Sequence, residues 1–88
     1  MREWTLDIGG KEWAIKFVQP SRLPDDTEGM CYLHPKKIHV ANNLAPERET
    51  LQIGHEIIHA RLWDLDHAAV YELAEATNTA FWRSVNAK

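Results

Sequence analysis

Residues 51–66 read LQIGHEIIHARLWDLD, and they hold an HExxH pattern formed by His55, Glu56 and His59. Apolar residues recur through this stretch with the spacing of one helix face, so we expect a helix that carries the whole pattern. On a helix, side chains at positions i and i+4 project from the same face, and the two imidazoles can therefore bind one cation. Glu56 would then lie beside the open coordination position as a general base. The stretch predicts two zinc ligands, His55 and His59, and a catalytic residue, Glu56.

The helix around this pattern is expected to begin at Pro46 and to continue to about Trp63. Proline suits the first turn of a helix, and the glutamates that follow it favour the positive end of the helix dipole. Residues 64–66 then form a short connection with Asp66 as N-cap, and residues 67–85, rich in Ala, Leu and Glu, predict a second helix. Two helices joined by a short link are expected to pack as an antiparallel hairpin.

Two β-hairpins are predicted before the helices. Residues 4–8 and 13–17 alternate apolar with polar side chains around a Gly-Gly pair, which is the pattern of a strand, a tight turn and a strand. Residues 30–34 and 37–41 flank a Pro-Lys turn in a second, shorter hairpin. The expected fold class is therefore α+β, with a small antiparallel sheet of about four strands packed on an antiparallel helical hairpin that carries HExxH.

The composition predicts a single domain over residues 1–88, because a chain of this length leaves no room for a second core. No apolar run approaches the ~20 residues of a membrane span, so we expect no membrane partner. The N-terminal residues lack the apolar core of a signal peptide, which predicts a cytoplasmic protein. A net charge of −3 argues against nucleic acid as a partner. The single Cys31 predicts a buried thiol without a disulfide.

A catalytic zinc site takes three protein ligands, so a third ligand must come from outside the pattern. If the two helices fold back about Leu65, Glu72 and Glu75 lie level with the histidines of the first helix. Glu72 borders the apolar stripe of the second helix whereas Glu75 points away from it, and Glu72 is therefore the expected third ligand. His67 remains a competing ligand, but it sits near the turn and would need a distorted connection to reach the metal.

Three segments resemble, in their order, the compact zincin domain of ImmA/IrrE-type metallopeptidases and of small metallopeptidases encoded by phages. They are GMCYLHPKKIHV (29–40), LQIGHEIIHARLWDLD (51–66) and AVYELAEATNTAFW (69–82). Glu72 falls where that family places its third, acidic ligand, so the resemblance implies a minimal, gluzincin-like zincin domain. It also implies zinc-dependent hydrolysis of a peptide bond, in several members that of a helix-turn-helix repressor.

These patterns together predict a zinc metallopeptidase in which Glu56 activates zinc-bound water against a protein or peptide substrate. The residue that stabilises the oxyanion stays open among Tyr71, Tyr32 and His34. An exposed edge of the second hairpin would hold an extended substrate by strand addition. The alternative is a noncatalytic module of the same fold that zinc stabilises and that binds a partner protein. Four protein ligands on the zinc would favour this alternative, whereas three protein ligands and a water would favour the peptidase.

Overall fold

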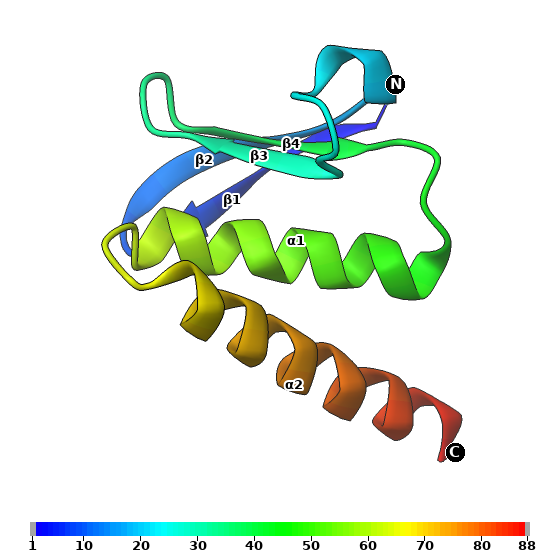
Figure 1. The fold of residues 1–88 in the computed structure, drawn as a ribbon. Coiled ribbons are helices and arrows are strands. Elements are labelled where there is room, and N and C mark those ends of the chain that lie inside the picture. The colour runs from blue at the N-terminus through cyan, green and yellow to red at the C-terminus, as the bar shows by residue number, and fades with distance from the viewer. Residues whose placement is uncertain (1, 88) are drawn as a thin grey trace.

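Four strands and two long helices form three layers in the computed structural model, which describes residues 2–87 (Figure 1). The elements in chain order are β1 (Glu3–Ile8), β2 (Lys11–Val18), a 3-10 turn η1 (Pro20–Arg22), β3 (Gly29–Tyr32), β4 (Lys37–Ala41), α1 (Pro46–Arg61) and α2 (His67–Asn86). The sheet lies on one side of α1 and α2 lies on the other (Figure 1). The α+β architecture predicted from the sequence is confirmed.

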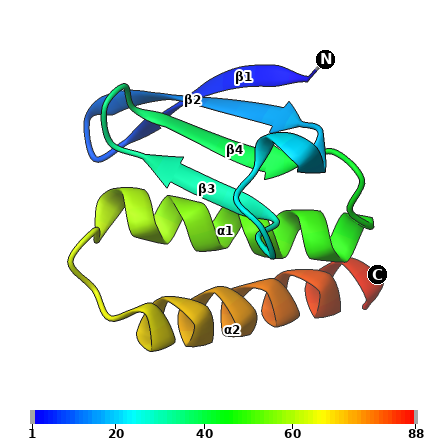
Figure 2. The same cartoon turned by 45° about the horizontal axis from the view of Figure 1, so that its top comes forward.

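The sheet contains both predicted hairpins and joins them through a parallel pair of strands. β1 pairs with β2 and β3 pairs with β4, both antiparallel, and the spatial order is β1-β2-β4-β3. β2 and β4 run parallel, with Ile15 opposite Ile38. The sheet is therefore mixed rather than wholly antiparallel, because β4, with Ile38 and Val40 fully buried, takes a central position. β3 is left at the edge, alongside α1 (Figure 2).

The main core lies between the sheet and α1. Alternation along β2 turns every second side chain toward the helix, as expected for a strand with one buried face. The buried members of this core are Ile8, Trp13, Ile15, Phe17, Ile38 and Val40, and Ile53, Ile57 and Ala60 of α1 pack against them. A smaller cluster of Val18, Leu23 and Ala41 lies next to η1. The core thus fixes which face of α1 is turned toward the sheet.

The helical hairpin begins where the sequence predicts. Pro46 is the first residue of α1, and Asp66 is the N-cap of α2. α1 ends at Arg61, slightly before the expected Trp63. No helix within residues 2–87 is both long and apolar enough to cross a membrane.

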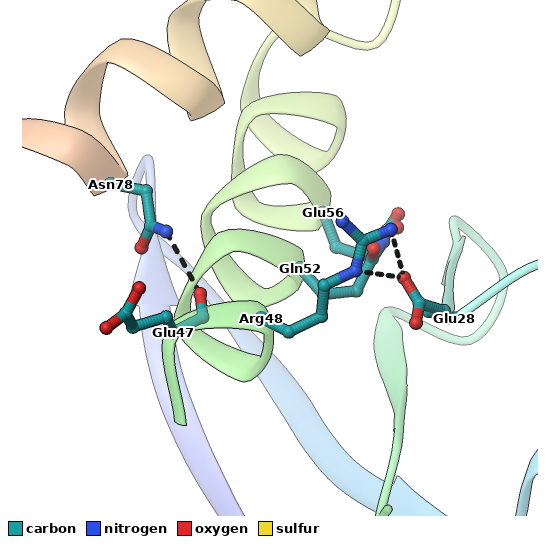
Figure 3. A network of polar contacts seen from close by, with 6 residues as sticks. All are labelled: Glu28, Glu47, Arg48, Gln52, Glu56 and Asn78. Carbon is teal, nitrogen blue, oxygen red and sulfur yellow. Dashed lines mark hydrogen bonds and ion pairs between the residues drawn. The ribbon is translucent and has the colours of Figure 1, made fainter. Parts of the chain in front are cut away.

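Three polar side chains hold α2 to the first turns of α1. The Thr50 hydroxyl donates to Asn78 Oδ1 at 2.6 Å and accepts a hydrogen bond from Trp82 Nε1 at 2.7 Å. Asn78 Nδ2 donates to the Glu47 carbonyl oxygen at 3.0 Å, as Figure 3 shows. These bonds connect the two helices near the end opposite their link, and we call them the Thr50–Asn78–Trp82 tether.

Candidate metal centre

The HExxH pattern lies on α1, as predicted, and its two histidines converge. The Nε2 atoms of His55 and His59 are 3.1 Å apart. Two imidazole nitrogens on one tetrahedral zinc ion, each bound at 2.0–2.1 Å, would lie roughly 3.3 Å apart. His55 is buried with 8% of its surface exposed, whereas His59 is half-buried. One imidazole is therefore fixed within the protein and the other borders solvent.

The third member of this group is His67, the first residue of α2. One potential ligand atom from each of His55, His59 and His67 lies within 4.8 Å of the other two. The ring centroid of His67 lies 5.1 Å from that of His55 and 5.2 Å from that of His59. Among the residues that the structure describes, this is the group of ligands close enough to hold a metal ion. The three donors are all imidazole nitrogens, so the residues present fit a transition metal such as zinc.

Glu72, the third ligand expected from the sequence, is not brought to this group. Its side chain is exposed on α2, as is that of Glu75. The reason is the rotation of α2, which packs on α1 through Val70 and Ala74. Because each residue turns a helix by about 100°, Glu72 lies about 200° around the helix from Val70, whereas His67 lies only about 60° away. The helix therefore brings His67, although it is exposed, to the histidines of α1 and turns Glu72 away from them.

Burial and mutual repulsion favour the neutral forms of His55 and His59. Burial, followed by the positive charges that His59 and His67 would carry, lowers the pKa of His55 to about 4. Burial, and then the charge of His67, also lowers the pKa of His59. A metal binds only the neutral imidazole, so His55 and His59 can bind a cation at neutral pH without first releasing protons.

Glu56 is more deeply buried than either histidine of the pattern, with 4% of its surface exposed. Burial raises the pKa of its carboxyl to about 7. A hydrogen bond from Gln52 lowers this pKa, but its effect is smaller than that of burial. Gln52 Nε2 donates this bond to Glu56 Oε2 at 2.5 Å. A carboxyl with this pKa exchanges protons near neutral pH, which is the property that a general base and acid requires.

The backbone of Gly29 lies directly against this carboxyl. A Cβ added there would lie 2.7 Å from Gln52 Cγ and 3.0 Å from Glu56 Oε2. The start of β3 is held beside α1 by Arg48, whose Nε donates to Glu28 Oε1 at 2.7 Å. Figure 3 shows Gln52 and Glu56 behind this ion pair. Sequence reasoning missed Gln52 and Gly29 as parts of the site.

A cleft of about 250 Å³ opens beside Glu56 and His59, lined also by Met30, Cys31 and Leu33 on the β3 side. Burial, and then the charge of Glu56, raises the pKa of the Cys31 thiol to about 11. The thiol is therefore not ionised at neutral pH and is a poor nucleophile. The cleft thus gives solvent access to the carboxyl and to one imidazole.

Of the three residues considered for oxyanion stabilisation, Tyr71 lies beside the histidines. Its ring centroid is 5.5 Å from that of His55 and 6.4 Å from that of His67. Tyr32 instead packs edge-on against His39, with ring centroids 5.2 Å apart. His34 lines a separate cavity near the end of α1.

Comparison with protein-family models, with curated proteins and with solved structures finds no match to this chain. The site is therefore characterised by its own geometry, in which three imidazoles converge and one of them, His59, shares a cleft with the buried carboxyl of Glu56.

Proposed function

We propose that this chain is a zinc-dependent metallopeptidase that hydrolyses a peptide bond in a protein or peptide substrate. The observation that supports this most strongly is the convergence of His55, His59 and His67 next to Glu56, a buried carboxyl with a pKa of about 7. Hydrolysis of an amide needs an activated carbonyl and a group that moves protons. Both requirements can be met by groups that border one cleft.

Zinc is the metal that these donors suit best. Three imidazole ligands leave one position of a tetrahedral site free, which is the arrangement of a catalytic rather than a structural zinc. When bound, zinc supplies Lewis acidity that polarises a carbonyl and makes water more acidic. His55, His59 and His67 would hold it. The third ligand would then be a histidine, where the resemblance to ImmA/IrrE-type metallopeptidases implied the acidic Glu72.

Glu56 would accept a proton from the attacking water on its carboxylate and later deliver that proton to the leaving amine. A pKa of about 7 means that both protonation states are accessible at neutral pH. The hydrogen bond from Gln52 fixes the carboxylate in one orientation. Tyr71 is the donor best placed to stabilise the oxyanion, because its ring stands next to that of His55.

The substrate would bind along β3. This strand has β4 on one side only, so its other edge has backbone groups available to pair with an added strand. Met30, Cys31 and Leu33 line the cleft that Glu56 and His59 also border. An extended peptide paired with β3 would therefore pass the metal centre with its backbone held in register.

The experiment that tests this function compares zinc content and proteolysis in the same preparations. Wild-type protein purified without added metal should contain close to one zinc ion per chain and should cleave an unfolded protein substrate. Glu56→Gln should keep the zinc and lose cleavage, because the neutral amide cannot accept the proton. Glu75→Gln, an exposed carboxyl on α2, is the matched control and should keep both.

Two results would remove the proposal. Folded wild-type protein that binds no zinc would exclude the metal centre, and cleavage that survives Glu56→Gln would exclude Glu56 as the base. Bound zinc without cleavage of any substrate would favour the alternative function, a noncatalytic module stabilised by zinc that binds a partner protein.

A further inference from the structure

A second cavity, of about 470 Å³, lies next to the cleft beside the metal centre. The two cavities share Leu33 and Trp63 in their linings. The second cavity lies where the β1–β2 turn, the β3–β4 turn and the end of α1 meet. Each of these segments contributes to its lining, through Gly9, Lys36 and Arg61 respectively. A peptide that binds along β3 would therefore reach this cavity on leaving the metal centre.

The polar lining of this cavity is cationic. Lys11, Lys36 and Arg61 line it together with His34, and no aspartate or glutamate does. Within residues 2–87, none of these three cations is within ion-pair distance of a carboxylate, whereas Arg2, Lys16 and Arg48 each are. The positive charge is gathered here in a chain whose net charge is −3. The cavity is thus a local site of uncompensated positive charge.

The Arg61 side chain is seated by the turn between β1 and β2. A Cβ at Gly9 would lie 2.9 Å from both Cδ and Nε of Arg61, and the φ of Gly9 is +61°, which also favours glycine. Arg61 therefore lies flat on the backbone of the turn. A guanidinium held in this way presents a planar pair of donors that matches a carboxylate.

The lining also contains apolar side chains. Trp13, which is 3% exposed, and Ile8 form the wall on the sheet side, and Leu33 and Trp63 form the side toward the metal centre. Lys11 and Arg61 are exposed to solvent and Lys36 is half-buried, so an anion can reach these cations and form charge-assisted hydrogen bonds with them.

We propose that this cavity binds a carboxylate of the peptide substrate and so selects acidic peptides for cleavage. The inference depends on the proposed peptidase function for its biological meaning, although binding can be measured without turnover. Two sources supply the same chemistry, namely an acidic side chain near the scissile bond and the C-terminal carboxylate of a short peptide. Arg61 would form the paired hydrogen bonds, and Lys11 and Lys36 would add charge.

The test measures binding of fluorescein-labelled peptides of one length to zinc-loaded Glu56→Gln protein by fluorescence anisotropy. The peptides carry either Glu or Gln at one position and either a free or an amidated C-terminus. We expect the charged form from one of these two sources to bind about tenfold more tightly than its neutral counterpart, which corresponds to about 1.4 kcal/mol. The arm that shows the difference identifies the source of the carboxylate.

Substitutions of the cavity's cations test whether the preference for charged peptides arises from this cavity. Arg61→Gln and Lys36→Gln should each reduce the ratio of affinities toward one, and Arg61→Lys should restore part of it. Lys16→Gln is the matched control, because Lys16 lies on β2 outside this cavity and should leave the ratio unchanged.

Equal affinities for charged and neutral peptides would overturn the proposal, as would no binding of any peptide or a preference that survives both Arg61→Gln and Lys36→Gln. Cleavage assays with wild-type protein separate this proposal from the proposed function. Cleavage without a charge preference would retain the peptidase and remove the carboxylate site. Charge-dependent binding without any cleavage would retain the carboxylate site and remove the peptidase function.

Discussion

His67 is the residue whose assignment most changes the chemistry of the site. Its replacement by alanine should weaken zinc binding by more than about 100-fold, because loss of a direct ligand should exceed the 10- to 100-fold effect of losing an outer partner. Glu72→Ala should leave the affinity almost unchanged, since Glu72 is exposed on α2 and is absent from the group of converging ligands. Competition with a zinc-binding dye measures both constants. If Glu72→Ala reduced the zinc affinity more than His67→Ala, Glu72 would be the third ligand.

The buried carboxyl of Glu56 should destabilise the metal-free protein as pH rises. Its pKa is about 7 in the folded protein against an ordinary value of 4.5. Because the folded pKa is the higher one, the stability linked to its protonation is present below pH 4.5 and is lost as pH rises through 7. Glu56→Gln cannot ionise, so its advantage in unfolding free energy over wild type should grow across this range to roughly 3 kcal/mol.

Urea denaturation of both proteins in chelator, at matched pH values, measures this difference. The comparison cancels the contribution of His55, whose pKa is shifted the opposite way, to about 4, and which titrates in both proteins. Glu72→Gln serves as the exposed control and should change the unfolding free energy only slightly. A difference that stays constant from acid to alkaline pH for Glu56→Gln would show that its carboxyl is not held in the buried, proton-binding state.

At the scale of elements, the contact between β3 and α1 depends on a residue without a side chain. Gly29→Ala should destabilise the fold by about 1–3 kcal/mol, the usual cost of overpacking, because the new Cβ would overlap Gln52 and press on Glu56. Gly54→Ala is the matched control, since a Cβ there meets nothing within 4 Å on α1. That substitution should stabilise the helix by about 0.5–1 kcal/mol.

Thermal and urea unfolding give both values, and the double variant Gly29→Ala with Gln52→Ala identifies the cause. Truncation of Gln52 removes the closest atom, so the double variant should recover part of the stability lost by Gly29→Ala. A Gly29→Ala protein as stable as wild type would mean that β3 is not held as closely to α1 as the structure places it.

Local signals in the sequence predicted where the helices begin but not how all the strands pair. Pro46 marked the start of α1, because proline favours the first turn of a helix, and Asp66 stands at the N-cap position of α2 without a side-chain capping bond. The parallel pairing of β2 with β4 was missed, since turn signals determine pairing only within a hairpin. Which strands then meet depends on burial across the whole sheet. Gln52 could have been found from its spacing of four residues before Glu56, whereas the role of Gly29 depends on a contact between distant elements.

At the scale of the whole molecule, the choice between Glu72 and His67 depends on how α2 is rotated on α1. The apolar stripe that pointed to Glu72 contains Val70, Leu73 and Phe81, but Leu73 and Phe81 are 47% and 51% exposed. The helix packs through Val70 and Ala74, which are 0% and 3% exposed, so the buried face is rotated from that stripe. A sequence with apolar residues on more than one side of a helix does not specify which side is buried, and the position of His67 follows from that choice.

The same architecture predicts where the protein would loosen on removal of the proposed zinc ion. α2 packs on α1 and lies away from the sheet, so it has two polar attachments: His67 at the metal centre and the Thr50–Asn78–Trp82 tether near the other end (Figure 1). Zinc would stabilise the fold through His67 by mass action, since it binds the folded arrangement of three imidazoles. Chelation should therefore increase hydrogen exchange first in the opening turns of α2 and leave β2 and β4 protected.

Asn78→Ala should produce the complementary pattern. Loss of its bonds to Thr50 and to the Glu47 carbonyl should cost about 1–2 kcal/mol and increase exchange in the last turns of α2 while zinc is bound. Asn86→Ala, at the end of the same helix, is the control and should change little. When Asn78→Ala is combined with chelation, both attachments are lost, and exchange along α2 should rise by more than the sum of the separate effects. Uniform loss of protection across the sheet and both helices after chelation would instead mean that the metal centre supports the whole fold as one cooperative unit.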